Sequence, residues 1–355
     1  MIQTKLKAGA LQLTLFIVVV IALLLASFLI FVHTYAQFNV QSNFVIETTQ
    51  NMNKGIQYAL FNDVSLNDST YIDLEDENYK SLKITRSYWG IFEKITSEAK
   101  IKNYRLERSA LIGATQPKLE RMALYLEDSN KPLVVVGNTK IQGMAYLPER
   151  GVRTGNISGH SYYGEQLIYG STKKSGALPK LVSEFETHLK NISTEERINY
   201  IDITKSQKFE NSFSQPVQVV FSPYEIRLEA ISLTGHIIVQ SKTSIVVAAS
   251  ANLKDVILIA PKVVIKDRVE GTFQVIATEA ITIGNKCHLH YPSALVVYNE
   301  NPQVSDDQFT SESTNNAITI HSDSKLDGVV LWHTVSKPKN YQPQILIDEN
   351  VLIRG

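Results

Sequence analysis

Hydrophobic residues form one unbroken run close to the N-terminus. Residues 10–32 read ALQLTLFIVVVIALLLASFLIFV. As an α-helix rising ~1.5 Å per residue, this run is long enough to cross a hydrocarbon core about 30 Å thick. A signal peptide has a shorter apolar region followed by a small-x-small cleavage site, for which Ser27 and Ala36 are weak candidates. The pattern therefore predicts a transmembrane helix over 10–33, behind a basic leader of residues 1–9.

Beyond this run, apolar residues recur every three or four positions with polar residues between them. Val40, Phe44, Met52 and Ile56 belong to this series, and the spacing is typical of a one-sided helix. No proline interrupts residues 1–116, so we predict one long helix whose second, amphipathic half covers 34–62. Two interpretations of this half stay open: assembly with other helices through these four residues, or packing on its own domain.

The middle of the chain has weaker patterns. Apolar spacing from Trp89 to Ala99 indicates a short helix, and two apolar runs at 122–126 and 132–136 indicate a β-hairpin. Pro179 opens an apolar-faced helix that ends at Lys190. The predicted organisation is a connecting α+β segment over 63–130, a first solenoid-like β segment over 131–178, an inserted helix over 179–200 and a β-solenoid over 201–355.

Internal repeats carry the prediction of the fold. Four windows of alternating hydrophobicity close at a glycine: VVVGNTKIQG at Gly143, VVIKDRVEG at Gly271, ITIHSDSKLDG at Gly328 and ILIDENVLIRG at Gly355. Residues 237–298 repeat at a spacing of about 17–21 residues, so that Ser241, Ala260 and Ala277 superpose, followed by Ile245, Ile265 and Ile283.

A turn of this length cannot bury its apolar face alone, so neighbouring turns must stack. We predict a mainly β fold: a right-handed parallel β-helix with loop insertions near 299–316 and 334–344 and short helical insertions. A sandwich or jelly roll is the alternative. Because the last window stops at its glycine, we expect the chain to end within a repeat that is either truncated or completed by a partner.

The 35 basic and 35 acidic residues cancel overall, so only the distribution of charge along the chain is informative. Lys5 and Lys7 precede a stretch without Asp, Glu, Lys or Arg that extends to Ile46, and the remainder is slightly acidic. The positive-inside rule then puts the N-terminus in the cytoplasm and the bulk of the chain outside. Dispersed basic residues give no support for nucleic-acid binding. The single cysteine excludes an intrachain disulfide and any multi-cysteine metal or redox site.

Candidate chemistry is sparse. His288 and His290 share one face of a predicted strand and could offer a metal two ligands, but no third ligand is evident, and an outward polar face over a buried Cys287 is favoured. Carboxylate pairs occur in turn-like segments, where solvated loop residues are usual: Asp306 with Asp307, Asp323 with Asp327, and Asp348 with Glu349. An aromatic stretch containing Tyr162, Tyr163 and Tyr169 fits a looped edge better than a sugar or protein contact. We expect no catalytic, cofactor-binding or metal-binding residue.

The N-terminus resembles known families. A short basic leader ending in glycine (MIQTKLKAG), followed by a small residue and about twenty apolar ones, resembles minor pilins and the pseudopilins of type II secretion. This resemblance implies cleavage between Gly9 and Ala10 and packing in the membrane by residues 13–20, which include Leu13, Thr14, Phe16 and Val20. Most members carry Glu where this chain has Thr14, so the resemblance favours tip-located members of the PilX and K-type kind. The repeats loosely resemble bactofilin-type solenoids.

These observations predict a non-enzymatic subunit of a bacterial envelope machine. By the resemblance, it serves a type IV pilus or a type II secretion system, is anchored in the inner membrane with its bulk in the periplasm, and has the lipid bilayer and other pilin-like subunits as partners. Without the resemblance, residues 1–60 describe a plain signal-anchor. The alternative function is a stand-alone anchored β-helix that binds or cleaves envelope polysaccharide.

Overall fold

The computed structural model describes residues 8–74, 79–113, 122–157, 159–193, 199–299, 317–334 and 344–355. Backbone contacts divide the chain into two compact units. The first comprises residues 1–87 and 93–112, and the second comprises 88–92 and 113–355. The leader residues 1–7 and most of both predicted loop insertions lie outside the described residues.

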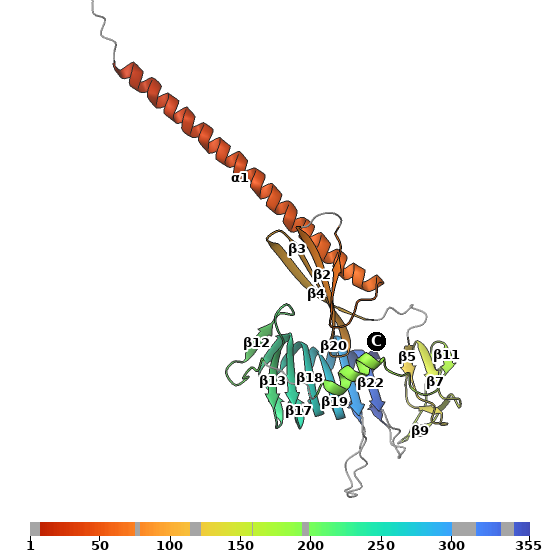
Figure 1. Ribbon diagram of the computed structural model, residues 1–355. Helices are drawn as coiled ribbons and strands as arrows, with labels where there is room; N and C mark the ends of the chain where they lie inside the picture. Colours follow the sequence, from red (N-terminus) through yellow and green to blue (C-terminus); the bar gives the residue numbers. More distant parts are fainter. Residues whose placement is uncertain are drawn as a thin grey trace, which may run out of the picture. The chain divides into compact units, whose positions relative to one another are not determined.

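The first unit contains a single long helix and a small sheet. Helix α1 (Ala8–Phe61) has 54 residues and runs without a break (Figure 1), as predicted. It is followed by β1 (Ser69–Ile72), β2 (Lys80–Trp89), β3 (Phe92–Ile101) and β4 (Tyr104–Ile112), which form a sheet in that order. Strand β1 is antiparallel to β2, and β3 is antiparallel to β4.

The short helix predicted from Trp89 to Ala99 is wrong, because this segment forms the end of β2 and most of β3. In β3 the buried residues alternate: Ile95, Ser97, Ala99 and Ile101 are all fully covered. This period of two is typical of a strand with one covered face. The sequence hid this alternation because a polar residue, Ser97, occupies a core position, so the apolar residues Trp89, Phe92, Ile95 and Ala99 were left at a helix-like spacing.

The second unit begins with short strands in small sheets. They are β5 (Met122–Tyr125), β6 (Leu133–Val135), β7 (Met144–Leu147), β8 (Val152–Thr154), β9 (Asn156–Ile157), β10 (His160–Ser161) and β11 (Thr172–Lys174). The predicted hairpin between 122–126 and 132–136 is wrong, because β5 pairs with β7 and β6 with β8, both in parallel. The repeat window that closes at Gly143 therefore lies outside the large sheet formed by the later windows.

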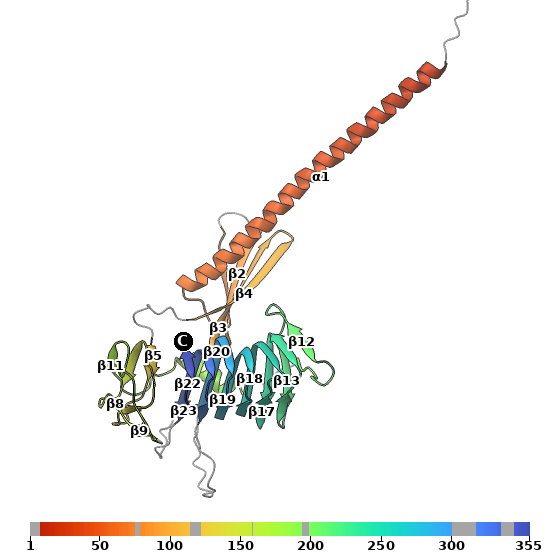
Figure 2. The ribbon, with the colours of Figure 1, turned by 180° about the vertical axis from the view of Figure 1, so that it is seen from behind.

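A large parallel sheet dominates the second unit, which confirms the mainly β class. Its thirteen strands are β12 (Lys208–Asn211), β13 (Gln218–Ser222), β14 (Ile226–Leu228), β15 (Ser232–Gly235), β16 (Ile237–Ser241), β17 (Ser244–Val247), β18 (Asn252–Ile265), β19 (Glu270–Ile283), β20 (His288–Asn299), β21 (Ile318–Ile320), β22 (Lys325–Thr334), β23 (Ile345–Ile347) and β24 (Leu352–Arg354). Figures 1 and 2 show these strands side by side from opposite directions. Each is hydrogen-bonded to strands of an earlier or later repeat.

The register confirms much of the repeat alignment. Ala260 pairs with Ala277 as predicted. A third segment ends each repeat, and these segments also pair with one another. Residues 263–265 pair with 281–283, residues 281–283 with 318–320, and residues 318–320 with 345–347. The alignment predicted Ile265 as the partner of Ile245, which is two positions off, because Ile245 pairs with Val263. A slip of two residues keeps the same side chains on the same face, so hydrophobicity alone does not detect it.

The middle segments of the long strands are buried on both faces. In β18, Val256 and Leu258 belong to one apolar cluster, and Ile257 and Ile259 belong to another on the opposite face. Burial on both sides explains why this segment is a continuous apolar run instead of an alternating one. Helix α2 (Ser183–Asn191) contributes Leu189 to the second cluster. The sequence predicts a helix from Pro179 to Lys190; the observed helix begins four residues later and ends one residue later.

The turn 88–92 also belongs to the second cluster. Trp89 is buried there, with its ring centroid 5.2 Å from that of Phe213 and 4.7 Å from that of His236. The Gln274 side chain holds the turn by two hydrogen bonds: its Nε2 donates to Trp89 O at 2.9 Å, and its Oε1 accepts from the Ile91 backbone N–H at 2.8 Å. These two hydrogen bonds from one buried amide satisfy backbone groups that would otherwise be buried without a hydrogen-bond partner.

We predict that Gly235→Ala destabilises the second unit. Gly235 has a φ of +89°, and an added Cβ would lie 2.1 Å from the backbone oxygen of Asn211, its partner on the neighbouring strand. Backbone strain of this kind costs about 1–3 kcal/mol, which lowers the melting temperature of a unit of this size by ~2–10 °C. Fluorescence melts of the full chain in detergent report on this unit, since both tryptophans belong to it.

The matched control is Gly176→Ala. An added Cβ at Gly176 would meet nothing within 4 Å, so the melting temperature should stay unchanged or rise slightly. Equal melting temperatures for the two variants would contradict the close backbone approach at Gly235.

Candidate functional site

The N-terminal part of α1 exposes apolar side chains in every direction. Leu13 and Phe16 are more than half exposed, and Val20 is over a third exposed. The one polar group among the predicted membrane residues is satisfied within the helix, since Thr14 Oγ1 donates to Leu11 O at 2.9 Å. By length and composition this helix can cross a membrane, as an anchor or as a signal sequence.

The predicted processing site lies at the start of this helix. Gly9 is exposed and already helical, and the backbone of Ala10 continues the helix. Lys5 and Lys7, which set the predicted topology, lie outside the described residues.

The C-terminal part of α1 packs on the sheet of its own unit. Met52 is buried against Leu82 and Ala99. Gly55 lies so close to the sheet that an added Cβ would be 2.1 Å from Ser97 Oγ. An ion pair between Glu47 of the helix and Lys80 of β2 joins the same elements. The sequence left open whether this part of the helix assembles with other helices or packs on its own domain, and the structure shows it packed on its own domain.

The other three predicted assembly residues on the helix differ in exposure. Val40 is half exposed, whereas Ile56 is partly buried. Phe44 is also partly buried, with its ring centroid 6.2 Å from that of Tyr104. Next to it, a shallow groove is lined by Phe38, Gln41, Ser42, Val45, Ile46 and Tyr104. Exposed apolar residues on α1 thus continue from the membrane run to Ile46, and they occur again at Tyr58, Leu60 and Phe61 at the end of the helix.

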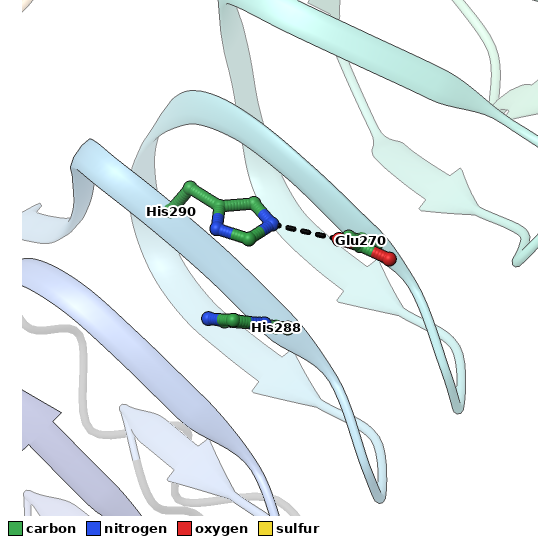
Figure 3. Close-up of side chains that lie close together, drawn as sticks. All are labelled: Glu270, His288 and His290. Atoms are coloured by element: carbon green, nitrogen blue, oxygen red, sulfur yellow. Dashed lines mark hydrogen bonds and ion pairs between the residues drawn. The ribbon is translucent and has the colours of Figure 1, made fainter.

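A histidine–carboxylate cluster lies on β19 and β20 of the second unit. Figure 3 shows Glu270, His288 and His290 side by side. Glu270 and His288 are direct partners in the parallel register, and His290 lies two positions farther along the same strand. His290 Nε2 is 2.8 Å from Glu270 Oε1, and the two imidazole centroids are 3.9 Å apart.

A second carboxylate lies on the other side of His288. Asp327 Oδ2 in β22 is 3.7 Å from His288 Nε2, and Asp327 Oδ1 accepts a hydrogen bond from Arg354 Nε at 2.8 Å. At 3.7 Å no hydrogen bond forms between His288 and Asp327. In the part of the chain that the structure describes, His288 Nε2 is covered and has no hydrogen-bond partner.

The sequence identified the two histidines but missed Glu270. The signal was available in the repeat: Glu270 precedes His288 by about eighteen positions, the length of one repeat. In-register stacking brings residues at this separation next to each other, so the repeat and the histidine pair together point to Glu270. Taken separately, neither does.

The remaining candidate residues occupy structural positions. Cys287 is buried, with its Sγ 3.1 Å from Lys266 O, and burial raises the pKa of its thiol; a protonated, buried thiol is inert as a nucleophile. Asp323 accepts a hydrogen bond from Asn350 Nδ2 at 3.2 Å, and Asp348 pairs with His321 at 2.8 Å. Asp306 and Asp307 lie outside the described residues.

The aromatic stretch is tied to its own loop. The hydroxyl of Tyr162 donates to Gln166 O, whereas Tyr163 is more than two-thirds exposed. Lys140 Nζ lies 5.0 Å from the ring centroid of Tyr169. The stretch therefore forms a looped edge with one exposed aromatic ring.

Comparisons with models of protein families, with curated proteins and with solved structures find no match for this chain. Its function must therefore be argued from its own residues.

We predict that Gly55→Leu loosens the sheet of the first unit. The side chain would have to displace Ser97 and Leu82, whose Cδ1 is already 3.0 Å from an ideal Cβ. Overpacking of this kind costs about 1–3 kcal/mol, which corresponds to roughly tenfold or more in local opening. Hydrogen-exchange mass spectrometry of peptides from β2 and β3 should show this acceleration.

Gln57→Leu is the matched control, because position 57 is exposed on the same helix. It adds a similar apolar side chain away from the sheet and should leave exchange in β2 and β3 unchanged. If both variants exchange alike, the helix is not packed on the sheet through Gly55.

Proposed function

We propose that this protein is a non-enzymatic structural subunit, anchored in a bilayer by α1, with the β-rich remainder of the chain on one side of the membrane. The observation that carries the proposal is the exposure of α1. From Ala8 to Ile46 the chain has no Asp, Glu, Lys or Arg, and large apolar side chains are exposed along this part of the helix. In water such a surface is strongly unfavourable, whereas in lipid it is the expected surface of a spanning helix.

We further infer that the large parallel sheet winds as a β-solenoid. One series of pairs joins Leu253, Gly271 and Leu289, with Leu326 next to Leu289 and Ile353 next to Leu326. Equivalent series run through the middle and third segments of the same strands. The apolar cluster that fills the space between them takes side chains from all three series. This is the core expected when each repeat makes one coil and successive coils stack.

Repeated turns support the solenoid. Arg268, Lys286, Asp323 and Asn350 all have a positive φ between 58° and 63°, and each comes three positions before a residue of the first series. The turns are bonded to one another, since Arg268 N–H donates to Asn285 O, Lys286 N–H to Ser322 O, and Asp323 N–H to Glu349 O. The same left-handed residue at the same corner of successive repeats is what a coil of constant shape requires.

Hydrogen bonding at these corners also has an electrostatic effect. Asn285 N–H donates to Asp267 Oδ1 at 2.8 Å and lowers the pKa of that carboxyl below its ordinary value. A carboxylate that is ionised at neutral pH suits a solvent-facing corner better than an active-site acid. This observation favours a structural role for Asp267.

The finer proposal is a pilin-like subunit of a type IV pilus or a type II secretion system, with its N-terminus in the cytoplasm. Its support is the continuous helix that begins near Gly9, carries a charge-free first half and packs its last turns on an antiparallel sheet. Thr14 bonds its own helix and needs no partner chain, which suits a filament end better than a repeated interior position. The exposed apolar residues Phe38, Val40 and Ile46 would then meet helices of other subunits.

The anchor is tested by placing charge in the middle of the apolar run. Ile21→Arg combined with Leu24→Arg costs about 2.5–3.5 kcal/mol for each arginine at the centre of a spanning helix. We expect wild-type protein to stay in carbonate-washed membranes of a bacterial host and the double variant to leave them. Tyr58→Arg with Leu60→Arg, two exposed positions at the far end of α1, should behave as wild type. Retention of the Ile21/Leu24 variant in washed membranes would overturn the anchor.

Processing distinguishes a pilin-like subunit from a plain anchor. In a host that has a prepilin peptidase, the intact mass of the purified chain should correspond to a protein that begins at Ala10. Gly9→Leu should keep the leader and its two lysines, because the resemblance implies cleavage after glycine. An intact Met1 in the wild-type protein would contradict the pilin-like proposal and leave the anchor standing.

A further inference from the structure

We propose that Glu270, His288 and His290 form a binding site for a divalent transition-metal ion, with Zn²⁺ as the best fit. One side-chain ligand atom from each residue can be chosen so that all three lie within 4.8 Å of one another. The inference does not depend on the membrane anchor or on the pilin-like assignment.

The site is built by the register of two parallel strands. Glu270 begins β19, and its direct partner His288 begins β20. Residues two apart on a strand point to the same face, so His290 joins His288 on the side where Glu270 lies (Figure 3). Between the two histidines, Leu289 points the other way and is buried in the main apolar cluster. This packing fixes the backbone that carries both imidazoles.

The three ligand types suit zinc. Neutral imidazole nitrogen and carboxylate oxygen bind Zn²⁺ at about 2.0–2.2 Å, so that ligand atoms around a tetrahedral ion lie roughly 3.3–3.6 Å apart. The distance from His290 Nε2 to Glu270 Oε1 is 2.8 Å, shorter than this value, and the full set extends to 4.8 Å. Small rotations of the side chains bring the three ligand atoms to the distances that a tetrahedral ion requires. The ion then takes the place of the proton between His290 and Glu270.

The surroundings favour an ion as well. The covered Nε2 of His288 has no hydrogen-bond partner among the described residues, and a buried polar atom in this state costs stability. Asp327 Oδ2, held by Arg354, lies 3.7 Å from this same nitrogen. With the ion bound at Nδ1 of His288, its Nε2–H is left to donate to Asp327, the carboxylate arrangement that commonly supports a metal-binding histidine. The side chains of His288 and His290 are 36% and 40% exposed, so an ion can enter from solvent and keep a water ligand.

Another histidine of the same sheet provides the comparison. His321 Nδ1 is 2.8 Å from Asp348 Oδ2, and its side chain is 40% exposed. The pair thus matches His290 and Glu270 in distance and in the exposure of its histidine, but among the described residues no second histidine joins it in a set of possible metal ligands. A bare histidine–carboxylate pair and the three-residue cluster can therefore be compared within one protein.

The test measures zinc binding by the full-length chain in detergent, purified with an affinity tag that contains no histidine. Isothermal titration with zinc chloride should give one ion per chain. His290→Ala and Glu270→Gln should each weaken binding by about tenfold or more, by analogy with losses at metal-site groups, and His288→Ala with His290→Ala should abolish it. His321→Ala should bind as wild type. Affinity should fall on acidification, because the ligands must be unprotonated.

Two further measurements keep the result clear. Cobalt(II) bound to the wild type should give the intense visible absorption of a tetrahedral site, and His290→Ala should lose it. Fluorescence melts show whether each variant is folded, and His290→Gln, which keeps a polar side chain of similar length, replaces His290→Ala if that variant unfolds. No zinc bound by the folded wild type, or equal binding by the wild type and the His288/His290 double variant, would overturn the proposal.

Discussion

In-register pairing between successive repeats is the constraint on which the second unit depends. The long strands β18, β19 and β20 are hydrogen-bonded to the repeat before and the repeat after them, and their apolar side chains pack with those of the same neighbours. No single repeat could satisfy its backbone or bury its apolar face alone. Insertions of one or two residues interrupt the register within the long strands. The longer insertion lies between strands, and the pairing resumes after it, where Ile318 pairs with Ile281.

This constraint explains how much of the fold could be predicted. The apolar run and the absence of proline were sufficient to predict α1, and the repeat spacing was sufficient to predict a mainly β fold in which successive repeats pair with one another. The two-residue error at Ile245 was invisible because period-two patterns are unchanged by such a slip. The errors at β3 and at the supposed hairpin have a different cause: a buried Ser97 broke the alternation, and short apolar runs do not reveal whether a neighbour is parallel or antiparallel.

Contacts between distant segments were the least predictable part. Nothing in the local sequence of Gln274 indicates that its amide binds the turn that carries Trp89, more than 180 positions earlier. A glutamine in an apolar strand is unusual, and its position could have been marked as one that needs a partner. The partner itself follows only from tertiary structure. In the same way, Met52 and Val40 belong to the same apolar series, and only the sheet of the first unit shows that Met52 is covered and Val40 exposed.

Stacking also organises the surface of the sheet. Residues on the outer face of one repeat lie beside those of the next. Ion pairs therefore join neighbouring repeats: Lys262 with Glu279, and Asp327 with Arg354. Each pair on the surface contributes little to stability, but together they avoid columns of like charge. At His288 and His290 the column departs from this pattern, because two imidazoles lie next to each other, with Glu270 beside one and Asp327 beside the other. Imidazole and carboxylate ligand atoms placed together by a rigid register are the arrangement that a bound cation completes.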